Sequence, residues 1–142
     1  MFASINAYPF HMSYFNEIAG GKENGWKYLA DSNIDWGQDI YFLAEDIEKQ
    51  RNDDKNRVFY GNVFGTIRPE DAGIRLQPIP EKGLSCKGKK ATVYLSVNKY
   101  LLKSALHPDG LYPWLLRIPF DRIIGSSIMV WDDICGSNGQ KR

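Results

Sequence analysis

Six side chains that could bind or transform a ligand lie within nine consecutive residues of this chain. They are Asp31, Asn33, Asp35, Trp36, Gln38 and Asp39. The apolar run over residues 26–30 predicts a strand, and the residues from Asp35 onward predict a helix. Ligand sites in α/β folds usually lie at the carboxyl ends of strands. We therefore expect these side chains to cluster at the carboxyl edge of a sheet and to bind a ligand there, with Trp36 partly buried beneath them.

These residue types fit several kinds of chemistry. Asp31, Asn33 and Asp35 have the spacing that opens an EF-hand calcium loop. That loop needs Gly at its sixth position and Glu at its twelfth, where this chain has Trp36 and Phe42. Asp31 and Asp35 could also form a glycosidase-like carboxylate pair, although this spacing is common by chance. Asn33 or Asp35 could instead cap the following helix, and Trp36 could stack on a sugar ring.

The rest of the sequence offers no convincing catalytic set. The only two histidines, His11 and His107, have no Ser or Cys arrangement of the nucleophilic-triad type around them. The sequence has no phosphate-binding glycine motif, and its net charge of +1 gives no footprint for nucleic acid. We therefore predict no catalytic residue, no metal, no cofactor and no nucleic-acid partner. A calcium or magnesium site of another type near Asp31 and Asp35 is the alternative that the sequence leaves open.

The two cysteines, Cys86 and Cys135, lie in loop-like sequence outside any C-x-x-C pair. This spacing argues against a zinc site. Free thiols in such loops would be exposed, so the pattern slightly favours a disulfide in an oxidising compartment. Two separate thiols remain the alternative, because the geometry of the fold decides whether the pair can be bridged.

Hydrophobic periodicity predicts the elements that hold the polar segment. Apolar residues at steps of four, three and four define the core face of the first helix: Trp36, Ile40, Leu43 and Ile47. Further strands are predicted at 57–65, 91–97 and 122–131, and short helices at 69–73, 99–105 and 112–116. Strands that read as apolar runs alternate with helices, so we expect an α/β domain with a small, mostly parallel sheet of about four strands flanked by helices. The last strand can run antiparallel, because little chain remains for a crossover helix.

Composition divides the chain into three regions. Residues 1–21 form an aromatic arm, residues 22–135 the α/β domain and residues 136–142 a flexible polar tail. No run approaches the ~20 apolar residues of a membrane span. Residues 2–18 nevertheless carry many large apolar side chains and few charges, so we expect them to pack on the domain, on a neighbouring copy or on a membrane surface.

Three stretches in this order resemble a pattern in bacterial polytopic GT-C membrane glycosyltransferases, namely Tyr8–Asn16, Ala19–Gly21 and Asp31–Asp39. That family includes enzymes similar to protein O-mannosyltransferases and aminoarabinose transferases. There the pattern follows the last transmembrane helices and opens a soluble C-terminal domain outside the cytoplasm. Weaker similarities occur at Tyr60–Gly61, Ser96–Val97 and Ile124–Ile128. The resemblance covers most of the chain, and its specific part is Asp31–Asp39.

The resemblance implies an inverting sugar transfer from a polyprenyl-phosphate donor on the outer face of a bacterial cell membrane. It also implies that the catalytic Asp lies in a loop near the amino terminus of the whole enzyme, so no residue of this chain inherits that role. The expected function is a non-catalytic extracytoplasmic domain, in contact with the transmembrane portion of its parent. Such a domain would assist binding of a glycan acceptor or of the lipid-linked donor, with residues 2–18 against the membrane surface.

Two other functions remain open from the residues alone. One is a free-standing small soluble hydrolase that uses Asp31 and Asp35 as its carboxylates. The other is a purely structural interaction module. A parent reading frame with many apolar spans upstream would favour the membrane enzyme and exclude the free-standing hydrolase.

Overall fold

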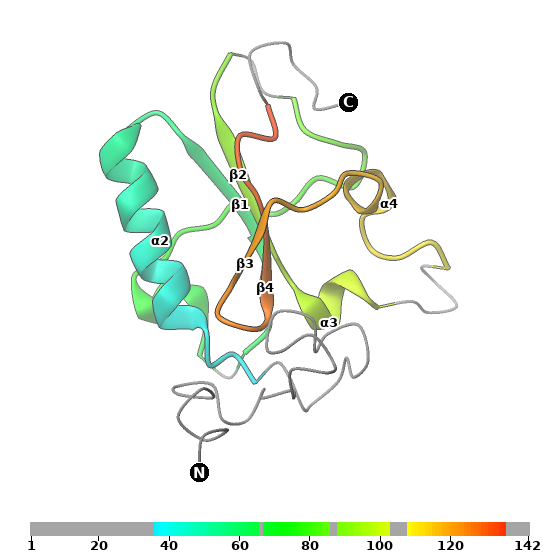
Figure 1. Ribbon diagram of the computed structural model, residues 1–142, viewed down its shortest axis with the longest axis horizontal. Helices are drawn as coiled ribbons and strands as arrows, with labels where there is room; N and C mark the ends of the chain where they lie inside the picture. The colour runs from blue at the N-terminus through cyan, green and yellow to red at the C-terminus, as the bar shows by residue number, and fades with distance from the viewer. Residues whose placement is uncertain (1–35, 66, 86–87, 103–107, 136–142) are drawn as a thin grey trace, which may run out of the picture.

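A computed structural model describes residues 36–65, 67–85, 88–102 and 108–135 as a four-stranded sheet with helices on its two faces (Figure 1). The long helix α2 covers one face, and the short helix α4 lies on the other. In chain order the elements are α2 (Ile40–Asp53), β1 (Val58–Asn62), the 3₁₀ helix η4 (Pro69–Ala72), β2 (Ala91–Ser96), α3 (Val97–Tyr100), α4 (Pro113–Leu116), β3 (Arg122–Ile124) and β4 (Ile128–Trp131).

The sheet is mixed, with strand order β1-β2-β4-β3. β1 and β2 pair in parallel, whereas β4 runs antiparallel to both β2 and β3. The predicted α/β class is confirmed, but the prediction of a mostly parallel sheet is wrong. The predicted strand 122–131 is in fact a hairpin, because Gly125 adopts a left-handed φ of 60° and the chain reverses after it. That reversal brings β4 back beside β2 in the antiparallel direction.

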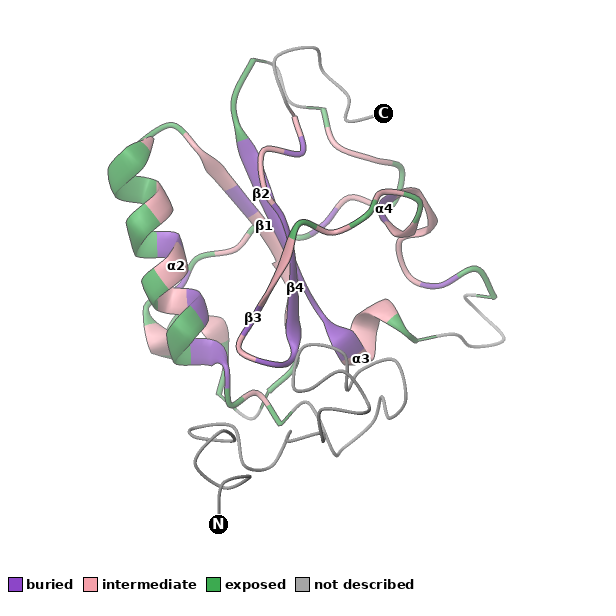
Figure 2. Cartoon of the chain, in the orientation of Figure 1, coloured by how far each residue is buried: buried purple, intermediate pink, exposed green. Residues whose placement is uncertain are grey.

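β2 is the centre of the molecule, and all six of its residues are buried (Figure 2). It has a paired strand on each side and a packed layer on each face. A strand in this position cannot show apolar–polar alternation, since both of its faces meet apolar side chains. The apolar run over 91–97 in the sequence therefore reports a central strand.

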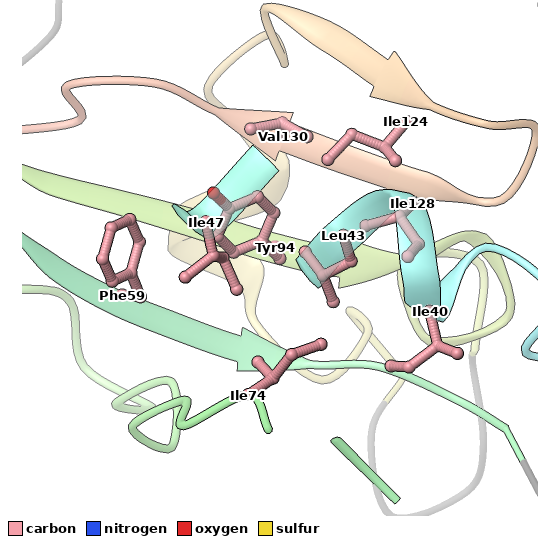
Figure 3. Close-up of a cluster of buried hydrophobic side chains, with 9 residues drawn as sticks. All are labelled: Ile40, Leu43, Ile47, Phe59, Ile74, Tyr94, Ile124, Ile128 and Val130. Carbon is pink, nitrogen blue, oxygen red and sulfur yellow. The ribbon is translucent and has the colours of Figure 1, made fainter. Parts of the chain in front are cut away.

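The core beneath α2 is formed by one face of that helix and the facing side of the sheet (Figure 3). Ile40, Leu43 and Ile47 are all buried, as the periodicity predicts. They pack in one cluster with Phe59 of β1 and Tyr94 of β2, whose rings are stacked at 6.4 Å. The apolar stripe of α2 thus fixes the helix against the parallel strand pair.

The core on the opposite face is richer in aromatic rings. Trp131 of β4 is fully buried, and its indole donates a 2.8 Å hydrogen bond to the Ile118 carbonyl. Tyr100 and Phe120 pack against the same ring with centroids 6.3 and 6.2 Å away. Leu115 of α4 completes this layer. A buried Trp needs a partner for its N–H, and the loop carbonyl supplies one.

Two of the three short helices agree closely with the prediction, and the third begins earlier than predicted. η4 begins at Pro69 and ends at Gly73, which has a left-handed φ of 75°. α4 falls within the predicted 112–116. α3 begins at Val97 with Ser96 in the N-cap position, two residues before the predicted start at 99. The predicted strand over 26–30, like the arm and the tail, lies outside the described residues.

Within the described ranges, no helix combines the length and the apolar character that crossing a bilayer requires.

Candidate functional site

Three of the six candidate residues belong to the described structure. Trp36, Gln38 and Asp39 lie in the segment that leads into α2, and Asp31, Asn33 and Asp35 lie outside the described residues. α2 starts at Ile40 with Asp39 in the N-cap position. Gly37 of this segment contacts Gly65, which follows β1, so the segment lies at the carboxyl edge of the parallel strand pair, where α2 begins (Figure 1).

Asp39 is fully buried and binds the turn between β3 and β4. Its Oδ2 accepts hydrogen bonds from the backbone N–H groups of Ser126 and Ser127, at 2.8 and 3.0 Å, and from the Ser127 hydroxyl at 2.7 Å. Its side chain makes no capping bond to α2 itself. One carboxylate therefore joins the start of α2 to a turn 87 residues further along the chain.

Gly125 leaves room for that carboxylate. A Cβ at this position would overlap the Asp39 carboxyl group, and its φ of 60° is unfavourable for any other residue. The second carboxylate oxygen, Oδ1, is buried and has no hydrogen-bond partner among the described residues. The Asp39 side chain is thus enclosed by the turn rather than open to a ligand.

Gly37 makes a second close contact at this edge. Its φ is 81°, and a Cβ there would overlap the Cα of Gly65, which follows β1. The preceding residue, Phe64, donates its backbone N–H to Ser96 Oγ at 3.1 Å. The start of α2, the end of β1 and the end of β2 are therefore held together by backbone contacts that only small residues permit.

Trp36 is exposed, with 51% of its surface accessible. The prediction that it is partly buried and begins the core face of the helix is wrong, because the helix begins four residues later at Ile40. The Trp36 backbone N–H donates to Gln38 Oε1 at 2.8 Å, and Gln38 Nε2 lies 3.4 Å from Ser126 Oγ. The edge therefore presents an aromatic ring on a backbone fixed by its neighbours.

Among the three described candidates, the Asp39 carboxylate is occupied by the turn, and the exposed side chains are the Trp36 indole and the Gln38 amide. In the part of the chain that the structure describes, no three His, Cys, Asp or Glu side chains gather as metal ligands would. An exposed indole suits stacking on a sugar ring.

A second polar cluster lies on the α2 face of the sheet, toward the opposite edge. Asp46 Oδ2 accepts hydrogen bonds from Tyr94 Oη at 2.8 Å, Gln50 Nε2 at 2.8 Å and Arg122 Nη2 at 2.9 Å. Arg122 also binds Asp132 through two nitrogens, at 2.6 and 3.0 Å. The sequence reasoning did not predict this cluster. The feature that could have indicated it is the i, i+4 pair of Asp46 and Gln50, which lies beside the apolar stripe of α2.

The ionic partners set the protonation of this cluster. Burial acts to raise the pKa of Asp46, but hydrogen bonds from Arg122 and Tyr94 outweigh it and hold that pKa below its usual range. Burial and the neighbouring Asp46 carboxylate raise the pKa of Tyr94, which stays a neutral hydroxyl donor. Arg122 keeps its charge, because its bonds to Asp132 and Asp46 raise its pKa against the effect of burial. The arrangement is that of a structural ion cluster.

We expect this cluster to make the stability depend on acid pH. Because the pKa of Asp46 is lower in the folded chain, its contribution is present above the unfolded pKa and is lost as pH falls through the folded value. The free energy of unfolding should therefore decrease between about pH 5 and pH 2, and Asp46→Asn should flatten that decrease.

Urea denaturation across this pH range, followed by circular dichroism, measures the effect. Asp71→Asn is the matched control, because Asp71 pairs with Arg68 in an exposed ion pair. Equal pH slopes for the wild type and Asp46→Asn would contradict this interpretation.

A half-open cavity of about 290 Å³ lies away from the candidate edge, near the amino ends of β1 and β2. Its lining is Val58, Tyr60, Gln77, Leu84, Ser85, Lys89, Ala91 and Cys135. Cys135 is disulfide-bonded, and the only other cysteine of the sequence is Cys86. The disulfide alternative from the sequence therefore holds for Cys135, and Cys86 itself lies outside the described residues.

Comparison of the chain with models of protein families, with curated proteins and with solved structures finds no significant match.

Proposed function

We propose that this chain is a non-catalytic extracytoplasmic domain of a bacterial polytopic membrane glycosyltransferase that uses a polyprenyl-phosphate sugar donor. Its role is to assist binding of the glycan acceptor or of the lipid-linked donor. The resemblance of Asp31–Asp39 to the GT-C pattern supports the family assignment. The transmembrane portion of the parent enzyme is its expected partner.

Exposed Trp36 is the observation that carries this proposal. Trp36 has the spacing of the apolar stripe of α2, yet it lies four residues before the helix begins, and more than half of its surface is accessible. Gly37 packs on Gly65, and Gln38 holds the Trp36 backbone, so the ring is presented from a fixed position. Fixed aromatic surfaces lose little conformational entropy when they stack on a ligand.

The disulfide at Cys135 supports the extracytoplasmic location. Disulfides persist in oxidising compartments and are rare in the cytosol, where thiols are kept reduced. The bond also lies beside the end of the last strand, where Ile134 donates its N–H to the Ala91 carbonyl at 3.0 Å. The Ile134 hydrogen bond ties the carboxyl end of the described domain to β2.

Removal of the Trp36 ring should weaken sugar binding. We expect Trp36→Ala to reduce the affinity for a short-chain polyprenyl-phosphate sugar or a free oligosaccharide at least about tenfold, which corresponds to ~1.4 kcal/mol. Titration followed by the indole N–H signals in NMR spectra measures this change. A panel of hexose and aminopentose derivatives is needed, because the sequence does not specify the sugar.

Two controls separate stacking from other effects. Trp114→Phe removes an indole that donates to the Pro80 carbonyl at 2.9 Å on the other side of the sheet, and it should leave the affinity unchanged. Polyprenyl phosphate without a sugar reports binding through the lipid alone. Equal affinity of Trp36→Ala and the wild type for every sugar, or the absence of any sugar-dependent binding, would refute the proposed role.

A further inference from the structure

The half-open cavity of about 290 Å³ lies at the amino ends of β1 and β2. Val58 and Ala91 begin these two strands, pair with each other and form part of the apolar lining together with Leu84. Figure 1 shows the beginnings of both strands at the end of the sheet opposite to the start of α2. The cavity volume lies near the lower limit of about 300–1,000 Å³ for small-molecule sites and far exceeds the ~30 Å³ of one water molecule. The cavity therefore has room for a ligand about the size of one sugar ring.

Half of the lining side chains are polar and can donate hydrogen bonds. They are Tyr60, Gln77, Ser85 and Lys89. Within the described part of the chain, none of these four side chains makes a hydrogen bond or an ion pair. Tyr60 is the most informative of them, because its ring is half-buried in the apolar layer on the α4 face, and a phenol in such a position ordinarily has a partner. The cavity thus collects hydrogen-bonding groups that the fold itself does not use.

Backbone hydrogen bonds fix this lining from three directions. The Gln77 backbone pairs with β1 through bonds of 2.8 and 2.9 Å. The carbonyl of Lys90, adjacent to Lys89, accepts the N–H of the first residue of β1 at 3.0 Å. Ile134, adjacent to Cys135, donates its N–H to the first residue of β2 at 3.0 Å. The cavity is therefore formed before a ligand binds, which lowers the entropic cost of binding.

The charge of the lining favours an anionic ligand. Lys89 is the only charged residue among the described lining residues, and no Asp or Glu is among them. An ammonium group donates three hydrogen bonds and accepts none, so its partner must be an acceptor. Carboxylate and phosphate oxygens form the strongest hydrogen bonds with such a cation. The hydroxyl and amide groups of the other polar side chains can both donate and accept, as the hydroxyl groups of a ligand require.

We propose that this cavity binds a small polyhydroxylated anion, about the size of one sugar ring, that carries a carboxylate or a phosphate group. Lys89 pairs with the anionic group, and the neighbouring polar side chains hydrogen-bond with the hydroxyl groups. The inference goes beyond the proposed function and does not depend on it, because the cavity and Trp36 lie at opposite ends of the sheet.

Isothermal titration calorimetry of the full chain tests the requirement for a negative charge. The probes are glucuronate, glucose 6-phosphate and glucose, which share one ring and differ in the group attached to it. We expect at least one of the two anions to bind at least about tenfold more tightly than glucose, which corresponds to ~1.4 kcal/mol. The tighter anion identifies the carboxylate or the phosphate as the recognised group. No preference for either anion over glucose, or no binding of any probe, would overturn the proposal.

A matched pair of lysine variants locates the bound anion. Lys89→Gln removes the charge of the lining and should weaken binding of the preferred anion about tenfold. Lys82→Gln removes an exposed charge from the same connection between η4 and β2 without changing the lining, and it should leave the affinity unchanged. Equal affinities of Lys89→Gln and the wild type, or equal losses for the two variants, would overturn the proposal.

Two further variants separate this cavity from the site at Trp36. Tyr60→Phe removes only the hydroxyl group and should weaken binding of the same anion severalfold, whereas Trp36→Ala should leave it unchanged. Near-ultraviolet circular dichroism verifies that each variant is folded. Loss of anion binding in Trp36→Ala but not in Tyr60→Phe would place the anion at the other end of the sheet and overturn the proposal.

Discussion

Asp39→Ala is expected to lower the free energy of unfolding by about 3–5 kcal/mol. The substitution removes an acceptor that serves the backbone N–H groups of Ser126 and Ser127 and the Ser127 hydroxyl. Both serines are buried, so the three donors left behind cannot be hydrated without local opening. A domain of ordinary stability would lose a large share of its total by this one change.

Urea denaturation of the wild type and the variants measures this loss. Asp39→Asn keeps one carbonyl oxygen as an acceptor and should recover part of the stability, which separates hydrogen bonding from cavity formation. Asp71→Ala removes the exposed Arg68–Asp71 pair and should change stability by less than about 0.5 kcal/mol. A loss below 1 kcal/mol for Asp39→Ala would show that the buried carboxylate does not hold the β3–β4 turn.

Gly125→Ala should be far more damaging than Gly73→Ala, although both glycines have a left-handed φ, of 60° and 75° respectively. A Cβ at Gly73 meets nothing within 4 Å, so the expected cost is the backbone strain of about 1–2 kcal/mol. At Gly125 the added methyl overlaps the Asp39 carboxyl group, and overpacking adds about 1–3 kcal/mol to the same strain.

Both substitutions place an alanine at a left-handed φ and share that backbone strain. The difference between them therefore measures the overlap of the added methyl group with the Asp39 carboxyl group. Denaturation midpoints at constant slope give the difference in stability. Hydrogen exchange should further show faster exchange of the Ser126 and Ser127 amides in Gly125→Ala. Equal losses for the two variants would mean that Asp39 can move aside at little cost and that the packing at this edge is loose.

The elements could be predicted where the sequence reports burial directly. The stripe Ile40, Leu43 and Ile47 identifies the core face of α2, and the apolar run of β2 identifies a central strand. Gly73 predicts the end of η4, because glycine readily adopts the left-handed conformation that ends this helix. These signals are local, since a helix or strand period and a cap lie within a few residues of one another.

Strand direction and the roles of the polar residues could not be predicted, because they depend on contacts far apart in the chain. The Asp39 carboxylate accepts hydrogen bonds from Ser126 and Ser127, which lie 87 and 88 residues further along the chain. The cluster around Asp46 is completed by Arg122, 76 residues away. Trp36 has the spacing of the core stripe, but α2 starts after it and its side chain stays outside.

The mass and membrane association of the native polypeptide test the central proposal most directly. An antibody against this domain, applied to soluble and carbonate-washed membrane fractions of the source cells, measures both at once. A domain of a polytopic glycosyltransferase should appear in the membrane fraction as a band several times heavier than the 16.2 kDa of this sequence. A single band of about that mass in the soluble fraction would contradict the proposal.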